Sequence, residues 1–275
     1  PSKGEFIEGK KSSKNYTPSQ ISSLILSKLK GYSSGVKKAV ITVPAMFADR
    51  ARTATMDAAK LAGIEVLELI NEPTAAILHY ANLPGVNVSG RVLVFDLGGG
   101  TFDVTIAKVQ GKSVDVITSR GDKNLGGTDF DREIVKILSE KYKKEKKVPL
   151  NEKDKNFLDI AEKLKRILSV KDKASEVIDG PKGPLKIEIT KAQFEKSIQI
   201  YLEKIKMLME EALDTAGCSH QQISETLLVG GSTRIPCVIE TIKKIMKKTP
   251  KKGVNVDEAV ASGAAIYAGL LSKKD

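Results

Sequence analysis

Apolar side chains recur along this chain with two spacings, three to four residues apart in some segments and two apart in others. The first spacing is typical of an amphipathic helix, and the second of a strand with one buried face. In the first part of the chain, helices are predicted over 18–30, 49–62 and 73–81, and strands over 38–43 and 64–70. Further strands are predicted over 91–95, 102–109 and 113–119. Short turns between these last strands favour an antiparallel meander.

The rest of the chain begins with a lysine-rich and mostly helical stretch. A helix starts near Asp129 and is followed by a helix over 157–168, a hairpin across 180–183 and a long amphipathic helix over 191–216. A strand over 225–229 and helices over 235–247 and 257–271 come last. The alternation of helices and strands predicts an α/β protein.

The two halves of the chain repeat one order of elements, which is helix, strand, helix, short strand, helix. We therefore expect a first lobe over 1–82 and a second lobe over 83–275, with a mainly helical insertion subdomain at about 130–222. Only the second half has three strands and a glycine loop before its first helix. Without such strands a lobe exposes a long sheet edge, which folded proteins avoid. The expectation is that the first lobe is incomplete and lacks its N-terminal strands.

Composition and charge exclude several classes of protein. The net charge is +11, and lysines cluster at 141–147 and 243–252, but both runs continue helical patterns and lack the interleaved aromatic residues of single-strand binders. No apolar run approaches the roughly 18 residues of a membrane span, and the chain does not open like a signal peptide. Two cysteines are too few for a disulfide scaffold. We expect a cytoplasmic protein with no nucleic-acid or membrane partner.

The strongest local motif is the glycine run between Asp96 and Asp103. Three consecutive glycines, 98–100, allow a tight turn whose N–H groups form a nest for phosphate oxygens. Carboxylates beside such a nest suit Mg²⁺ held through water. The alternative is a plain glycine hairpin in which the aspartates only form turns. The paired acids and Thr101 favour the phosphate site.

Two further glycine pairs precede helices. The segment 229–234 joins a strand to a helix, and 125–129 repeats the arrangement more weakly. Such a junction offers unpaired N–H groups and a partial positive charge to an anion. A tight connection capped by Ser232 or Thr233 explains the same residues, so the alternatives are evenly balanced for this segment.

Other features carry less chemistry. Glu162, Lys165, Arg166 and Ser169 share one helix face, and polarity alone predicts that this face is solvated. The triplet at 111–113 looks like the end of a P-loop, but the required earlier glycine is absent, which favours a hairpin turn. The dinucleotide fingerprint is also absent. His79 and His220 are isolated, so a hydrolytic triad is not expected.

Taken together, these segments resemble the ATPase domain of the seventy-kilodalton heat-shock (DnaK-type) chaperones. The segment 92–105 is similar to that family's second phosphate signature, and 228–236 to its third. Further similar stretches lie at 43–52, 71–76, 125–131 and 257–265, in the family's order. The resemblance implies an actin-like, duplicated ribonuclease H-like α/β fold with two lobes and with nucleotide in the cleft between them.

The resemblance also implies roles for matching positions. Asp96 would hold Mg²⁺ through water, and Asp103 or Glu72 would orient the attacking water. The implied catalytic residues are Asp96, Asp103, Glu72 and Thr101. The implied nucleotide-binding residues are Gly98, Gly99, Gly100, Thr101, Gly126, Gly127, Glu162, Lys165, Arg166, Ser169, Gly230, Gly231, Ser232, Arg234 and Asp257. Arg166 would stack on adenine. Pro44 and Arg52 match positions that relay nucleotide state to a peptide-binding domain.

The implied function is that of a chaperone ATP hydrolase with ATP or ADP and Mg²⁺ as cofactors, and with K⁺ as a further candidate ion. Its partners would be J-domain proteins and nucleotide exchange factors, with client peptides bound only by a domain outside this sequence. The family's first phosphate signature and its lysine are expected upstream of Pro1. Val256 and Ala48 depart from the usual proline and asparagine. The alternatives are a non-catalytic nucleotide- or co-chaperone-binding module and a sugar or acetate kinase.

Overall fold

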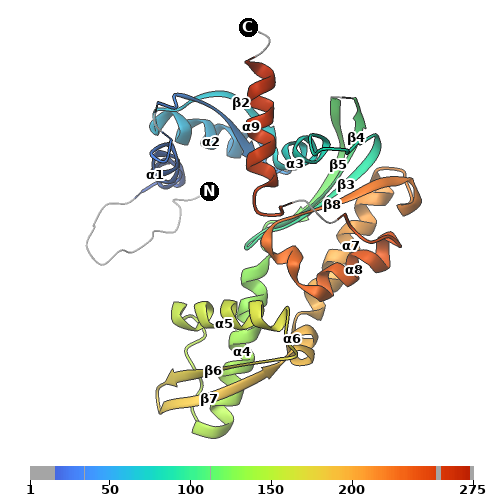
Figure 1. Ribbon diagram of the computed structural model, residues 1–275. Coiled ribbons are helices and arrows are strands. Elements are labelled where there is room, and N and C mark those ends of the chain that lie inside the picture. Colours follow the sequence, from blue (N-terminus) through green and yellow to red (C-terminus); the bar gives the residue numbers. More distant parts are fainter. Residues whose placement is uncertain (1–15, 34, 112, 252–254, 273–275) are drawn as a thin grey trace. The chain divides into compact units, whose positions relative to one another are not determined.

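The computed structural model describes residues 16–33, 35–111, 113–251 and 255–272, and shows a mixed α/β protein with several sheets (Figure 1). Contacts divide the chain into two compact units, residues 1–84 with 260–275 (unit 1) and residues 85–259 (unit 2). In the described ranges, no helix is both long enough and apolar enough to cross a bilayer.

Unit 1 contains the helices and strands predicted for the first part of the chain. Its elements are α1 (Pro18–Lys30), β1 (Lys38–Val43), α2 (Asp49–Leu61), β2 (Glu65–Asn71) and α3 (Glu72–Ala81). Strands β1 and β2 pair in parallel. Helix α1 starts where the sequence specifies it, because Thr17 and Gln20 form a capping box around Pro18.

The C-terminal helix α9 (Ala259–Leu271) lies beside β2 and packs against other elements of unit 1 (Figure 1). A Cβ on Gly263 would lie 1.8 Å from the carbonyl oxygen of Ala75 in α3, so this approach requires glycine. The Tyr267 hydroxyl donates to Glu68 Oε2 of β2 at 2.9 Å. Contacts therefore group α9 with unit 1, whereas the expected lobes, 1–82 and 83–275, stay a prediction.

Unit 2 is built on a four-stranded sheet in the order β5-β4-β3-β8. The strands are β3 (Gly90–Leu97), β4 (Phe102–Gln110), β5 (Ser113–Asp122) and β8 (Ile223–Val229). The first three form the predicted antiparallel meander, and β8 pairs in parallel with β3. The core is apolar, with Phe95 and Phe102 fully buried and their ring centroids 4.8 Å apart. The turn predicted at 111–113 contains Lys112, which lies outside the described residues.

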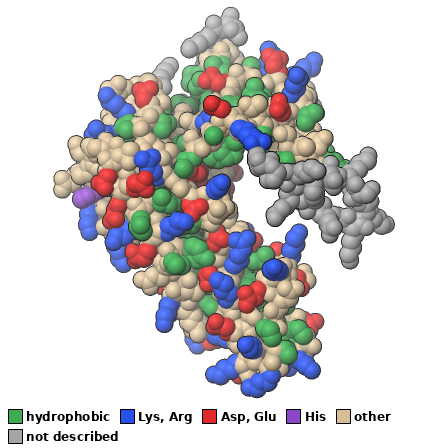
Figure 2. All heavy atoms as spheres, turned by 180° about the vertical axis from the view of Figure 1, so that it is seen from behind, with side chains coloured by type: hydrophobic (Ala, Val, Ile, Leu, Met, Phe, Trp, Pro, Cys, Tyr) green, Lys and Arg blue, Asp and Glu red, His purple; other side chains and the backbone are tan. Residues whose placement is uncertain are grey.

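The mainly helical part of unit 2 follows β5. Its elements are α4 (Gly127–Lys146), α5 (Lys155–Leu168), β6 (Lys173–Gly180), β7 (Gly183–Thr190) and α6 (Lys191–Ser197). Strands β6 and β7 form the predicted hairpin. Figure 2 shows Lys and Arg side chains interspersed with Asp and Glu on the face in view. Many are paired locally, as Lys136 is with Glu133 one turn earlier on α4.

The prediction of one continuous helix over 191–216 was wrong. Two helices, α6 and α7 (Gln199–Thr215), meet at Ile198, whose φ of −96° and ψ of 5° interrupt the helix. The interruption redirects the chain, because α6 packs on α4 and β7 whereas α7 packs on β4 and β5. Phe194 and Ile198 are both buried at this corner. The chain then continues through β8 and a short 3₁₀ turn (Gly231–Arg234) into α8 (Pro236–Met246).

Candidate functional site

Three glycine loops meet at one end of the unit 2 sheet. The loop at 98–101 joins β3 to β4, Gly126 and Gly127 join β5 to α4, and the loop at 230–232 joins β8 to α8. The carbonyl oxygen of Gly98 accepts hydrogen bonds from the Gly127 N–H at 3.0 Å and from the Ser232 hydroxyl at 3.0 Å. Loops that are far apart in sequence are therefore hydrogen-bonded through one shared acceptor.

Glycine is required at two of these positions. A Cβ on Gly126 would lie 2.4 Å from the carbonyl oxygen of Gly99. Gly230 has a φ of +84°, and its Cβ would lie 2.3 Å from the carbonyl oxygen of Leu97. At Gly100, in contrast, a Cβ would meet nothing within 4 Å. The first two glycines allow the loops to pack closely, and the third leaves open space over an exposed backbone.

Two carboxylates lie at the base of the first loop. Asp96 and Asp103 face each other across β3 and β4 as register partners. Burial, with a smaller contribution from the charge of Asp103, raises the pKa of Asp96 to about 6. Burial also raises the pKa of Asp103 to about 6. Ionisation of each group is therefore less favourable than in an exposed carboxyl, and a nearby cation would favour it.

These carboxylates fit Mg²⁺ bound through water better than a metal bound directly by protein. Among the described residues, no three His, Cys, Asp or Glu side chains are grouped closely enough to hold an ion. Mg²⁺ keeps several waters and commonly uses only one or two carboxylates. Asp96 and Asp103 supply such a set, and the exposed loop beside them has room for phosphate oxygens.

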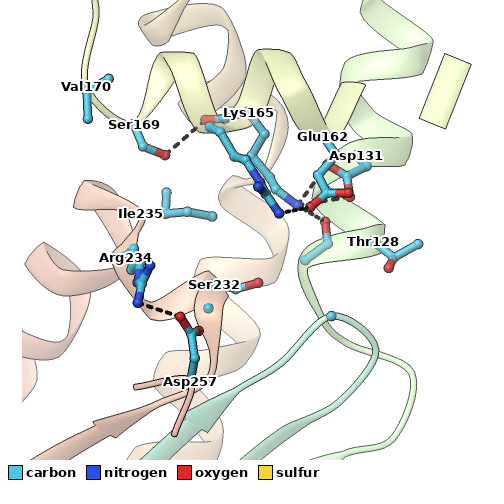
Figure 3. Close-up of a pocket in the computed structure, with 14 residues that line it drawn as sticks. Thr128, Asp131, Glu162, Lys165, Ser169, Val170, Ser232, Arg234, Ile235 and Asp257 are labelled. Atoms are coloured by element: carbon cyan, nitrogen blue, oxygen red, sulfur yellow. Dashed lines mark hydrogen bonds and ion pairs between the residues drawn. The ribbon is translucent and has the colours of Figure 1, made fainter. Parts of the chain in front are cut away.

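A cavity of about 650 Å³ opens beside the glycine loops, entirely within unit 2 (Figure 3). Figure 3 shows polar side chains from α5 on one wall and from the β8–α8 connection on the other. Of the residues predicted from the sequence to bind nucleotide, the cavity is lined by Gly99, Gly127, Glu162, Lys165, Arg166, Ser169, Gly231, Ser232, Arg234 and Asp257. The face of α5 that polarity alone assigned to solvent thus forms part of a cavity wall.

Each arginine of the cavity is paired with a carboxylate. Arg166 Nη2 donates to Glu162 Oε1 at 2.6 Å, one turn away on α5. Arg234 Nη2 donates to Asp257 Oδ2 at 2.7 Å. Both arginine side chains remain more than half exposed. These pairs hold planar guanidinium groups at the cavity, where they are accessible to a flat ligand.

The remaining predicted residues of unit 2 flank the cavity without lining it. They lie on the same three loops or on the adjoining strand ends, and they are Asp96, Gly98, Gly100, Thr101, Asp103, Gly126 and Gly230. The cavity wall also contains residues that the sequence did not identify, namely Thr128, Asp131, Val170 and Ile235. One signal was available for Asp131, because an acidic residue between Phe130 and Ile134 interrupts the apolar face of its helix.

Glu72, Pro44 and Arg52 belong to unit 1. Arg52 Nε donates to the carbonyl oxygen of Phe47 at 3.1 Å, and its Nη2 donates to Asn71 Oδ1 at 2.5 Å. Arg52 therefore ties the start of α2 to the end of β2, directly before Glu72. The roles of these three residues stay predictions.

The match to known families covers the whole chain. Residues 1–275 match the family described as Hsp70 protein. This family is one of ATP-binding chaperones with an actin-like ATPase fold, and in general it binds nucleotide and Mg²⁺. The mixed α/β architecture and the glycine loops around the cavity are consistent with that fold. The chain belongs to the Hsp70 family.

Proposed function

We propose that this chain is an ATP- and ADP-binding chaperone ATPase domain that holds the nucleoside in the unit 2 cavity and the phosphates on the glycine loops. One observation carries the proposal, which is that the Gly98 carbonyl oxygen joins three glycine loops into a single wall of a polar cavity. Loops of this kind bind phosphate through backbone N–H groups, which need close approach and therefore no side chain.

The cavity suits a purine nucleoside in size and chemistry. Its volume of about 650 Å³ lies within the usual range of roughly 300–1,000 Å³ for small-ligand sites. Arg166 and Arg234 offer guanidinium planes on which a flat base stacks, and their paired carboxylates fix the orientation of those planes. Ser169 and Ser232 add hydroxyl groups to the same walls.

The phosphates extend from this cavity over 98–101. Asp96 would hold Mg²⁺ through water, and Asp103 or Glu72 would orient the attacking water, with Thr101 close to the transferred group. When bound, the ion would supply positive charge to the phosphate oxygens. The chain's own residues position the reactants and exclude other geometries, which is how phosphoryl transfer is chiefly catalysed.

In the proposed cycle, nucleotide state controls peptide binding by a domain that is not among residues 1–275. Pro44 and Arg52 relay that state. The hydrogen bonds of Arg52 to Phe47 and Asn71 connect α2 to β2, so a movement of one element is passed to the other. J-domain proteins and nucleotide exchange factors are the proposed partners. No contact in the described residues favours a sugar or acetate kinase over this function.

Titration calorimetry with Mg-ADP tests the proposal. We expect Arg166→Ala to weaken binding about tenfold, which corresponds to the roughly 1–2 kcal/mol of a stacked cation. The matched control is Lys163→Ala, which removes another cation of α5 that pairs with Glu176 and lies outside the cavity lining. If the parent chain binds no Mg-ADP, the proposal fails.

Phosphate release separates an enzyme from a non-catalytic nucleotide-binding module. We expect Asp96→Ala to lower the rate of ATP turnover at least about a hundredfold, as is common when one charge-stabilising group is removed. Nucleotide binding without turnover in the parent chain would support the module instead. Turnover that Asp96→Ala leaves unchanged would show that the catalytic centre lies elsewhere.

A further inference from the structure

Asp131 is a buried carboxylate in the cavity wall with no role in the function proposed above. It lies on α4, four residues after Gly127, and only 6% of its surface is exposed. Two charged residues are buried among those that the structure describes, and the other is Lys165, which is 9% exposed. A buried charge is expensive unless it is paired, so its partner indicates what it does.

The partner of Asp131 is Lys165, which comes from the facing helix α5. The ammonium nitrogen Nζ lies 2.8 Å from Oδ1 and 2.9 Å from Oδ2 of Asp131, and it donates a hydrogen bond to Oδ2. It also donates to the carbonyl oxygen of Gly127 at 2.9 Å. Figure 3 shows these two side chains converging at the wall of the cavity.

We infer that Asp131 is a positioning residue that fixes the ammonium group of Lys165 so that it presents one N–H to an oxygen of the bound nucleoside. The inference rests on the proposed function of the cavity. A lysine ammonium has three N–H groups. Hydrogen bonds to Asp131 Oδ2 and to the Gly127 carbonyl use two of them, and we assign the third to a ligand in the cavity that Lys165 lines.

Lysine needs such an anchor because its side chain has four rotatable bonds and a strongly hydrated head. Without Asp131, the ammonium group would lose its fixed geometry and would turn toward solvent. The carboxylate also cancels the lysine charge inside the wall. The pair therefore directs a hydrogen bond at a neutral part of the ligand.

A purely structural role for this pair is the competing explanation, because the ion pair also ties α4 to α5. The two explanations differ in how the residues depend on each other during binding. A positioning residue acts through Lys165 alone, so its effect on ligand affinity must vanish when Lys165 is absent. It must also change the affinity for adenosine and for Mg-ADP by the same factor, since the contacted oxygen belongs to the nucleoside.

The experiment measures adenosine and Mg-ADP affinity by calorimetry in a double-mutant cycle of Asp131→Asn and Lys165→Met. We expect Asp131→Asn to weaken both ligands about tenfold when Lys165 is present and by less than about twofold in the Lys165→Met background. Asp131→Glu keeps the charge but displaces the ammonium group, so it should also weaken both ligands. The control is Asp159→Asn, an exposed carboxylate of α5 outside the cavity lining.

The outcomes distinguish this inference from the proposed function. If the parent binds neither adenosine nor Mg-ADP, the proposed function has failed and the inference fails with it. Parent-like affinity in both Asp131 variants would overturn the inference and leave the function intact. Tighter adenosine binding by Asp131→Asn would also overturn it, by showing that Asp131 holds Lys165 away from the nucleoside. An equal loss in the Lys165→Met background would show that Asp131 acts without Lys165.

Discussion

Replacing Gly126 with alanine tests whether the close packing of the glycine loops holds the site together. The new Cβ would lie 2.4 Å from the Gly99 carbonyl oxygen and 2.5 Å from the Gly100 nitrogen, whereas ordinary contacts begin at 3.4 Å. The loops must therefore separate by about 1 Å. The backbone of Gly126 is extended, with a φ of −170°, so alanine brings no backbone strain and the effect is purely steric.

The expected loss of stability follows from two terms. Overpacking of this kind costs about 1–3 kcal/mol. The separation also weakens two hydrogen bonds, from Thr128 N–H to Gly99 O at 2.7 Å and from Gly127 N–H to Gly98 O at 3.0 Å. Their partial loss together costs about 1 kcal/mol. We expect Gly126→Ala to lower the free energy of unfolding by about 2–4 kcal/mol. Urea unfolding followed by circular dichroism measures it, since the chain has no tryptophan.

Gly100→Ala is the matched variant. A Cβ at Gly100 meets nothing within 4 Å, so stability should stay within about 0.5 kcal/mol of the parent. The methyl group would instead occupy the space proposed for phosphate, and Mg-ADP affinity should fall at least about tenfold. Parent-like stability of Gly126→Ala would refute the packing argument. Full Mg-ADP affinity in Gly100→Ala would refute the placement of phosphate on this loop.

Further predictions concern the acidic pair and unit 1. Because burial raises the folded-state pKa of Asp96 from 3.8 to about 6, its ionisation opposes folding, and the parent should lose stability as pH rises through 6. In metal-free urea unfolding, Asp96→Asn should therefore be more stable than the parent by about 1–2 kcal/mol at pH 8. The full pKa shift sets an upper limit of roughly 3 kcal/mol, and the difference should shrink toward pH 4. Mg-ADP affinity, measured by calorimetry, should fall between pH 7 and pH 5 as Asp96 and Asp103 take up protons; a pH-independent affinity would contradict their role at the ion. In unit 1, Gly263→Ala should speed amide exchange in α3 and α9, since its Cβ would meet the carbonyl of Ala75, whereas Gly269→Ala, with nothing within 4 Å, should not.

The secondary structure was predictable where apolar periodicity and end signals agree. Strand β3 carries an unbroken apolar run over 92–95, and α1 is marked by Thr17 and Pro18. The interruption at Ile198 was missed because apolar residues keep a helical spacing across it. Only the tertiary structure shows that α6 and α7 pack on different partners and must change direction between them.

The glycine loops were visible in the sequence one at a time, but their meeting was not. It depends on β8 pairing in parallel with β3, more than a hundred residues earlier, which brings the loop of Ser232 to Gly98. Taken alone, 229–234 was as well explained by a capped turn as by an anion site. The structure shows that Ser232 donates to another loop instead, a role that local pattern does not reveal.

The acidic pair shows why such a site is a property of the folded chain and not of its motif. Two aspartates flanking glycines titrate normally in an unfolded chain, and their raised pKa values arise only when β3 and β4 bury them face to face. Above pH 6 the fold then carries an electrostatic penalty that a bound cation removes. A ligand that binds only the folded state adds stability by mass action. Added Mg-ADP should therefore stabilise unit 2 more at pH 8 than at pH 5. The burial that makes ionised Asp96 and Asp103 destabilising in the absence of an ion also makes the two carboxylates favour a bound cation.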